Sequence, residues 1–216
     1  MGEFRRESAK IREFAIASLL AAVIFLMTFT PIGFINLVVI NATIVHVPVI
    51  IGSIILGPGW GACLGALFGA ASLIRNTLTP TLLSFAFSPL MPVPGTGSGS
   101  AWALLICFGP RILVGVVPWY AARTFSAIRQ NDKKWRFASL FAAGVAGSMT
   151  NTLLVMHILY FVFKDAYAQI RNAQADAVYG MVLSIITGNG IPEAIVAGVF
   201  AAAACGAVEA YRRRDG

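Results

Sequence analysis

The chain has 216 residues, of which 58% are hydrophobic and only 12% charged, and its mean hydropathy is +0.80. An ordinary soluble domain needs far more polar surface to cover so large an apolar fraction, so the composition excludes one. The net charge of +7 alone is compatible with nucleic-acid binding. However, twelve of the sixteen lysines and arginines fall in three clusters that flank apolar segments, as in the cytoplasmic loops of membrane proteins. We therefore expect an all-α integral membrane protein, a single domain over residues 1–216, with the lipid bilayer and no nucleic acid as a partner.

Six apolar segments are long enough to cross the bilayer, which takes about 20 residues. In chain order they are residues 12–30, 38–57, 59–76, 101–123, 136–163 and 178–210. The basic clusters lie within 5–12, 123–136 and 212–214, so they place both termini and the fourth connection in the cytoplasm, which requires an even number of spans. The sequence therefore predicts a bundle of six transmembrane helices.

Long, charge-poor connections then lie on the outer side, at residues 30–40, 77–100 and 164–177. The first is hydrophobic, and the second mixes aromatic residues with prolines, which prevent a regular helix. Such loops either lie in the headgroup region or act as lids over an outward-facing pocket, and the sequence leaves both readings open.

Small residues recur at every fourth position of three segments, a spacing that allows close helix approach. The positions are Ala17 and Ala21 in the first segment, Gly61, Gly65 and Gly69 in the third, and Ala194, Gly198, Ala202 and Gly206 in the sixth. For the third and sixth segments we expect packing within the bundle. For the first segment, docking to a partner subunit is an open alternative.

Five polar residues lie within or at the ends of the apolar segments: Arg75, Arg111, Asn151, Asn189 and Glu193. A charge at the bilayer centre costs roughly 2.5–3.5 kcal/mol, and it is tolerated when it is paired or lines a wet cavity. At about 1.5 Å per residue, Arg111, Asn151 and Asn189 lie at similar depths below the outer surface. Arg75 lies near the outer end of its helix, and Glu193 one turn deeper than Asn189 on the same face. We expect these groups to border one cavity that opens outwards.

Arg111 and Glu193 allow two interpretations. They form a structural ion pair, or cationic and amide groups receive an anionic, hydroxylated small molecule, because a guanidinium group matches a carboxylate with two parallel hydrogen bonds. Two arginines against one glutamate favour the bound anion. His46 and His157 have no carboxylate neighbours, so we expect pocket lining or simple burial and no metal site.

The sequence contains no motif that indicates an enzyme. It lacks HExxH and paired acidic motifs, and the glycines of "PGTGSGS" at 94–100 are not followed by the Lys and Ser/Thr of a P-loop. We expect a transport protein without a cofactor, in which any ATP is hydrolysed by another subunit.

Several motifs in order resemble one family over residues 14–206. "AIASLLAAV" in the first segment and "IILGPGWGACLGALFG" at the second-to-third turn resemble the substrate-binding S component of energy-coupling factor (ECF) vitamin transporters. Within that family, "FGPRILVGVVPWY", "GSMTNTLLVM" and "TGNGIPEAIVAG" are similar to members assigned to pantothenate.

The resemblance implies a multi-pass protein of a prokaryotic plasma membrane that captures a vitamin from outside under its outer loops. It also implies an ECF module as partner, made of a transmembrane coupling subunit and two ATPases, and a contact of Ala17 and Ala21 with the coupling subunit. The S component is thought to topple in the membrane to deliver its cargo.

Pantothenate agrees with the residue chemistry, since it has a carboxylate, two hydroxyls, an amide and a gem-dimethyl group. We assign the carboxylate to Arg111 or Arg75 and the polar groups to Asn151, Asn189 and Asn76. The remaining candidates are Glu193 and His46 as polar lining, and Phe34, Phe85 and Trp102 as apolar wall or lid. The alternatives are an S component for another small vitamin and a stand-alone secondary transporter, for which we find no internal repeat.

Overall fold

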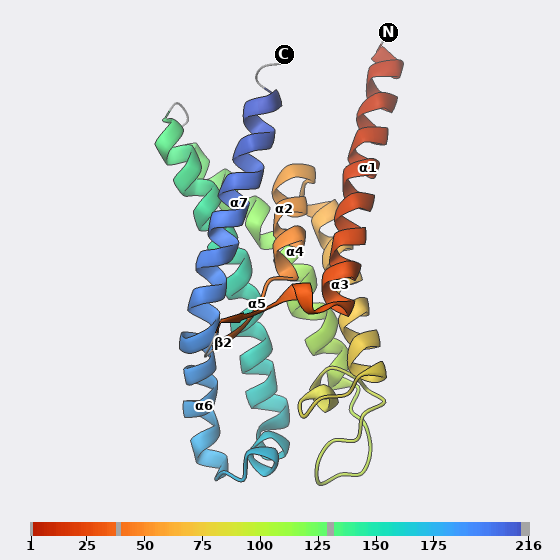
Figure 1. Ribbon diagram of the computed structural model, residues 1–216, viewed down its shortest axis with the longest axis vertical. Coiled ribbons are helices and arrows are strands. Elements are labelled where there is room, and N and C mark those ends of the chain that lie inside the picture. Colours follow the sequence, from red (N-terminus) through yellow and green to blue (C-terminus); the bar gives the residue numbers. More distant parts are fainter. Residues whose placement is uncertain (1, 38–39, 129–131, 213–216) are drawn as a thin grey trace.

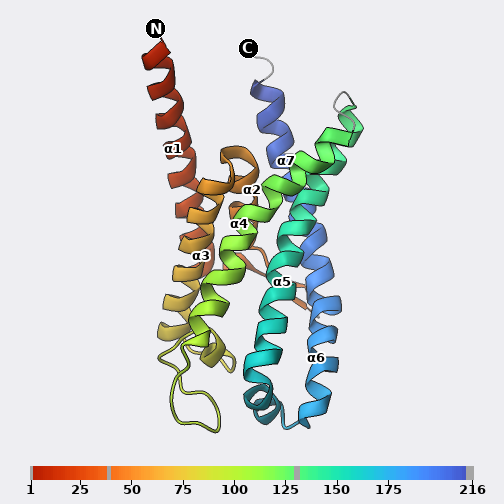
Figure 2. The same ribbon diagram turned by 180° about the vertical axis from the view of Figure 1, so that it is seen from behind.

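The computed structural model shows an elongated bundle whose helices run along its long axis (Figures 1 and 2). It describes residues 2–37, 40–128 and 132–212, without the side chains of residues 2–6, 8, 9, 32, 34–37, 40–42 and 212. Within these residues, the α-helices are α1 (Gly2–Phe29), α2 (His46–Leu56), α3 (Pro58–Leu78), α4 (Trp102–Ile128), α5 (Lys133–Arg171), α6 (Val178–Ile185) and α7 (Ile191–Arg212). The remaining elements are the short helices η1 (Pro31–Gly33), η2 (Ser84–Ala86) and η3 (Ala175–Ala177), the π-helix η4 (Ile186–Gly190), and the strands β1 (Phe34–Leu37) and β2 (Ile40–Thr43).

Four segments of the described chain are long and apolar enough to cross a membrane: Lys10–Phe29, Trp102–Ile128, Lys133–Arg171 and Ala175–Tyr211. Helix α2 is apolar but has only 11 residues, and α3 has 21. The predicted helical bundle of membrane type is therefore confirmed, with one small β-hairpin added. The count of six spans stays a prediction.

The two ends of the bundle differ in character. Both ends of the chain lie at the end of the bundle where α4 finishes and α5 begins (Figures 1 and 2). We call this the basic end, because it carries the basic clusters around Lys10, Arg123 and Lys133. The connection from α3 to α4 and the turn at η3 lie at the opposite end, which we call the loop end.

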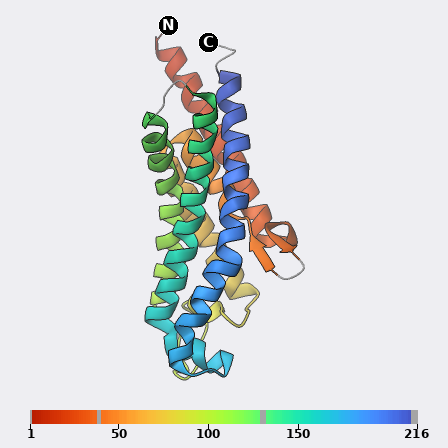
Figure 3. The ribbon, with the colours of Figure 1, turned by 90° about the vertical axis from the view of Figure 1, so that its left-hand side faces the viewer.

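The first connection departs from the prediction. We expected a continuous helix over 38–57, but β1 and β2 form an antiparallel hairpin with Phe34 opposite Thr43, and α2 begins only at His46. Asparagine and β-branched residues in "INAT" disfavour a helix and suit a strand, which explains the error. The hairpin lies beside the bundle near the middle of its length (Figure 3), so the described residues 30–37 and 40 of the predicted outer loop are not at the end of the molecule.

The last predicted span is interrupted. α6, η4 and α7 follow one another without a break, and the wider turn of η4 contains Asn189. A π-turn inserts an extra residue, and such turns are frequent at functional sites. The face on which Asn189 lies is thereby rotated relative to that of Glu193, so a regular α-helical spacing does not relate the two residues.

The glycines of α3 place α4 at close range. A Cβ atom added to Gly61, Gly65 or Gly69 would overlap the carbonyl oxygen of Gly115, Arg111 or Cys107, respectively. Backbone therefore contacts backbone along three turns, as small residues in membrane helices permit. The prediction that this stripe packs within the bundle is confirmed, and it fixes the position of Arg111.

The small residues of α7 act in the same way at a second contact. Ala194 and Ala202 are buried, and a Cβ atom on Gly198 would meet the ring of Phe141 in α5. Gly206 differs, because nothing lies within 4 Å of an added Cβ atom there. The packing prediction for the sixth segment is therefore confirmed for all but its last member.

Candidate functional site

Arg111 lies in the interior of the bundle, and its side chain is tied to its own helix. The residue is 6% exposed, and its Nη1 donates a hydrogen bond to the carbonyl oxygen of Ile106. Pro110 has no N–H, so the helix leaves that carbonyl without its usual donor four residues on. The proline thus creates the acceptor that holds the arginine beside it.

The remaining surface of the Arg111 guanidinium faces two aromatic rings. Its Cζ lies 5.5 Å from the ring centroid of Phe68 in α3 and 5.1 Å from that of Phe87, which follows η2 in the α3–α4 connection. Its Nε is buried and has no hydrogen-bond partner within the described part of the chain. Aromatic faces attract a cation but do not neutralise it.

Arg111 does not pair with Glu193. The ion pairs among the described side chains are Arg136–Glu209 and Lys164–Asp176. The carboxylate of Glu193 instead accepts a hydrogen bond of 2.7 Å from the backbone N–H of Thr43. The interpretation of Arg111 and Glu193 as a structural ion pair is therefore wrong, and Glu193 fastens the hairpin to α7.

His46 and Asn151 lie at the same level of the bundle on facing helices. A Cβ atom on Gly147 would meet Ile50 of α2 and Pro118 of α4, so these three residues mark one level. His46 is one helical turn from Ile50, and Asn151 is one turn from Gly147, both towards the loop end. Both residues therefore lie one helical turn beyond the same contact between α2 and α5.

Polar atoms remain unsatisfied at this level. Both ring nitrogens of His46 and the Oδ1 of Asn151 are buried without a hydrogen-bond partner in the described residues, and His46 is close enough to Arg111 to interact electrostatically. The Oγ of Ser148 on α5 is also buried without a hydrogen-bond partner in the described residues. Because buried polar groups are normally paired, several unpaired ones in the same part of the bundle as a buried cation are suited to a polar, anionic ligand.

Several predicted site residues lie elsewhere, towards the loop end. Asn76 donates to the carbonyl of Ser72 and accepts a hydrogen bond from Ser84, so its amide holds the α3–α4 connection. Arg75 is partly buried one residue before it and makes contacts of its own. Phe85 is 4% exposed and packs edge-to-face on Phe163 at 5.5 Å, so it belongs to the hydrophobic core.

The other aromatic candidates do not join Arg111 either. Trp102 is 56% exposed and lines a separate cavity of about 530 Å³ with Phe161. The side chain of Phe34 lies outside the described residues. Asn189 is partly buried in η4, beside Gly190, which contacts Thr152 of α5. Among the candidates, His46 thus lies near Arg111, Asn151 lies at the level of His46, and Asn189 lies on the turn that faces α5 beside Asn151. The candidates Arg75, Asn76, Phe85 and Trp102 lie further towards the loop end.

The alanine pair of α1 faces the bundle. Ala17 is 4% exposed, and Ala21 packs against a core that includes residues of α1, α2, α3, α4 and α7. Ser18 and Ala22, one position further along, are exposed. In the structure of the single chain, Ala17 and Ala21 therefore face the bundle, and the exposed small residues of α1 are the adjacent Ser18 and Ala22.

Sequence reasoning missed Phe68 and Phe87, whose rings face Arg111, and the unpaired hydroxyl of Ser148 in α5. The rings on Arg111 come from segments 43 and 24 residues away in the chain, so no local pattern points to them. Pro110 was a usable signal, since a proline in a helix always frees a carbonyl that a neighbouring donor can take.

Comparisons with known proteins show which family the sequence resembles. The family model described as "ECF transporter, substrate-specific component" matches residues 12–204. A curated relative, the pantothenic acid transporter PanT of Lactococcus lactis subsp. cremoris (strain MG1363), is 44% identical over 124 residues. That alignment covers 57% of this chain and 59% of the relative, so the match spans less than two thirds of the relative's length.

Proposed function

The chain belongs to the family of substrate-specific components of ECF transporters, and from this premise we propose that it binds pantothenate at the level of Arg111. The relative named as a pantothenic acid transporter supports this choice of vitamin. In this proposal the protein is the vitamin-binding subunit of an ATP-driven importer, and it carries out no chemical reaction on its cargo.

The observation that carries the proposal is the buried guanidinium of Arg111, which has no carboxylate partner among the described residues. A buried cation is costly unless an anion compensates it. The carboxylate of pantothenate is such an anion, and it would accept from the Nε and the remaining N–H groups of Arg111. The nearby His46, Asn151 and Ser148 offer the donors and acceptors that the hydroxyls and the amide of the vitamin need.

Other predicted groups keep secondary roles in this proposal. Arg75 lies near the loop end, outside the proposed contact with the carboxylate, and Asn189 lies in the π-turn across from α5. Asn76, Phe85 and Trp102 support the α3–α4 connection that roofs the site, and Phe34 belongs to the hairpin on its side.

We further propose that the chain is a multi-pass protein of a prokaryotic plasma membrane, with its basic end in the cytoplasm. Its partners are a transmembrane coupling subunit and two ATPases. Helix α1 contacts the coupling subunit on the side where Ala17 and Ala21 adjoin the exposed Ser18 and Ala22.

Calorimetric titration of the purified protein tests the substrate and the role of Arg111 together. Pantothenate is compared with pantothenol, in which a hydroxymethyl group replaces the carboxylate. If Arg111 binds the carboxylate, Arg111→Ala weakens pantothenate binding by roughly 30-fold or more, as for other buried charged pairs. The same variant binds pantothenol as the unmodified chain does.

Arg75→Ala is the matched control, since it removes the same group from the same half of the bundle and should leave the preference for pantothenate over pantothenol intact. Normal pantothenate binding by Arg111→Ala would refute the role of that residue. Tight binding of a different vitamin, with none of pantothenate, would overturn the substrate and keep the family. Uptake by vesicles that contain this chain without the ATPases would contradict the importer proposal.

A further inference from the structure

A second cavity lies at the basic end of the bundle, far from Arg111. It has a volume of about 890 Å³, within the range of ligand-binding cavities. Its walls come from the end of α2 and from α4, α5 and α7. The vitamin site explains none of its residues.

The lining of this cavity is divided by chemistry. Ile54, Ile55 and Leu140 provide an apolar wall, whereas Arg123 and Arg136 provide two cations and Glu209 one anion. The formal charge of the lining is therefore positive by one unit. An apolar wall beside a positive rim is complementary to an anionic amphiphile.

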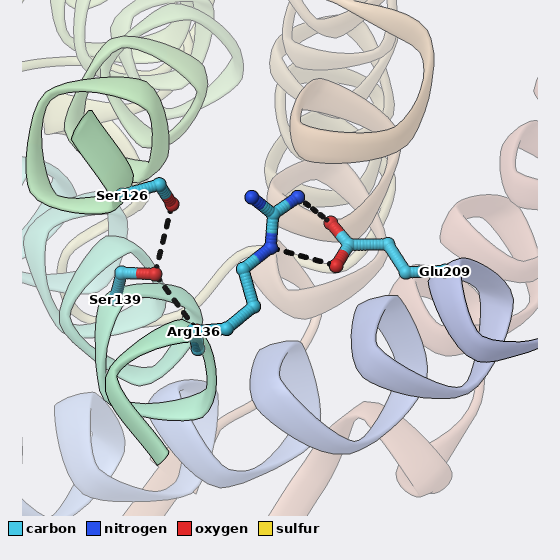
Figure 4. Close-up of polar contacts among 4 residues, drawn as sticks. All are labelled: Ser126, Arg136, Ser139 and Glu209. Carbon is cyan, nitrogen blue, oxygen red and sulfur yellow. Dashed lines mark hydrogen bonds and ion pairs between the residues drawn. The ribbon is translucent and has the colours of Figure 1, made fainter. Parts of the chain in front are cut away.

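Both arginines are held in place and keep donors available. Arg136 of α5 binds Glu209 of α7 through Nε and Nη2, and its third guanidinium nitrogen points away from that carboxylate (Figure 4). The guanidinium of Arg123 stacks over the indole ring of Trp119 at 4.2 Å. Stacking leaves the N–H groups at the edge of the guanidinium plane free to donate.

Two serines near Arg136, Ser126 and Ser139, have no hydroxyl hydrogen left to donate to an anion. Ser139 donates its hydrogen to the carbonyl of Arg136 at 2.8 Å, so it must accept the hydrogen of Ser126 across their 2.9 Å contact (Figure 4). Both hydroxyl hydrogens are thus committed within the protein. The arginines therefore remain the groups that recognise negative charge.

We propose that this cavity binds an anionic phospholipid of the adjoining membrane leaflet, with the phosphate at Arg123 and Arg136 and an acyl chain along the wall of Ile54, Ile55 and Leu140. Basic pockets between transmembrane helices bind anionic lipid headgroups in this way. The position of the cavity at the basic end, beside the cluster Lys133–Arg136, places it at the level of headgroups. The inference concerns a different site from that of pantothenate and does not depend on which vitamin is bound.

Trp119 lines the cavity and reports on its occupant. A chain in which Trp60, Trp102 and Trp135 are replaced by Phe is placed in phosphatidylcholine nanodiscs with a small, fixed fraction of brominated lipid, which quenches nearby indole fluorescence. Brominated phosphatidylglycerol is compared with brominated phosphatidylcholine. One net positive charge near the lipid predicts a preference of about fivefold for the anionic lipid.

Variants that lower or raise the positive charge of the cavity then test the assignment of the lipid site. Arg123→Gln should bring the preference close to one, whereas Glu209→Gln, which releases Arg136 and removes the opposing charge, should raise it by about another fivefold. Lys134→Gln removes an exposed cation at the same end outside the cavity and should leave the preference little changed. An increase in Glu209→Gln cannot come from a failure to fold.

Two results would overturn the inference. Equal quenching by the two lipids means that the cavity does not select a phospholipid, and leaves it as a contact surface for a partner protein. Loss of the preference on addition of soluble glycerol 1-phosphate means that the site binds a free phosphate ester and not a lipid.

Discussion

At the scale of single residues, the most informative pair is Pro110 and Arg111. A proline inside a helix costs about 3 kcal/mol relative to alanine, and here it frees the carbonyl of Ile106 for the arginine. The proline thus lowers the stability of the helix and at the same time fixes the orientation of a buried cation. Stability and ligand binding should therefore respond in opposite directions when the proline is removed.

We expect Pro110→Ala to raise the midpoint of thermal unfolding and to weaken pantothenate binding by about tenfold, since the new backbone N–H competes with Arg111 for Ile106. Pro118→Ala is the control, because it changes the second proline of α4 away from the arginine and should leave affinity unchanged. Thermal unfolding and calorimetry on the same samples measure both effects. Unaltered affinity in Pro110→Ala would show that the carbonyl of Ile106 does not position Arg111.

Glu193 is the second residue whose role the structure redefines, as the link between α7 and β2. Glu193→Ala removes a charge-assisted hydrogen bond of about 1.5–3 kcal/mol, so the amide of Thr43 should exchange with solvent at least tenfold faster. Glu193→Gln keeps an acceptor oxygen and should retain most of the protection. Equal exchange rates at Thr43 in all three chains would mean that other contacts hold the hairpin.

At the scale of elements, the contact between α3 and α4 depends on glycine. Gly65→Ala places a methyl group against the backbone of Arg111, and we expect a loss of roughly 1–3 kcal/mol in stability from this overpacking. Gly206→Ala is the matched control in α7, where an added Cβ meets nothing and the helix propensity of alanine stabilises by up to about 1 kcal/mol. Thermal unfolding of the two variants should shift in opposite directions, and parallel shifts would contradict the packing argument.

The same elements show what can be predicted from the sequence. The fourfold spacing of Gly61, Gly65 and Gly69 predicts a close helix contact, because spacing on one helix is a local property. That Arg111 is buried could also be expected, since it lies in the middle of an apolar segment. The hairpin was missed because "NLVVINAT" is as apolar as a membrane helix, and composition alone does not separate a buried strand from a buried helix. The separation of Trp102 and Phe85 from Arg111 depends on the direction of side chains in three dimensions, which no local pattern encodes.

At the scale of the whole molecule, two hydrophobic cores meet at the candidate site. One core joins the α3–α4 connection to α5 and α6 around Phe85, Phe163 and Tyr167, and the other joins α1, α2, α3 and α7 around Ile24, Ile50 and Phe68. Phe68 belongs to the second core and Phe87 packs against the first. Arg111 lies between these two rings, so a ligand bound there touches both cores.

Pantothenate should therefore tighten the α3–α4 connection as well as the helices around it. Hydrogen–deuterium exchange followed by mass spectrometry should show slower exchange on ligand addition in peptides that cover residues 84–88 and 43–50. At a hundredfold excess of ligand over Kd, binding adds about 2.7 kcal/mol to the free energy of unfolding. In Arg111→Ala a 30-fold weaker Kd reduces this gain to about 0.9 kcal/mol at the same ligand concentration, so the slowing of exchange in both segments should fall clearly, and peptides of the basic end around residues 120–127 serve as the internal reference. Protection that is confined to residues 43–50 would show that the ligand contacts only one core and that Phe87 does not take part in the site.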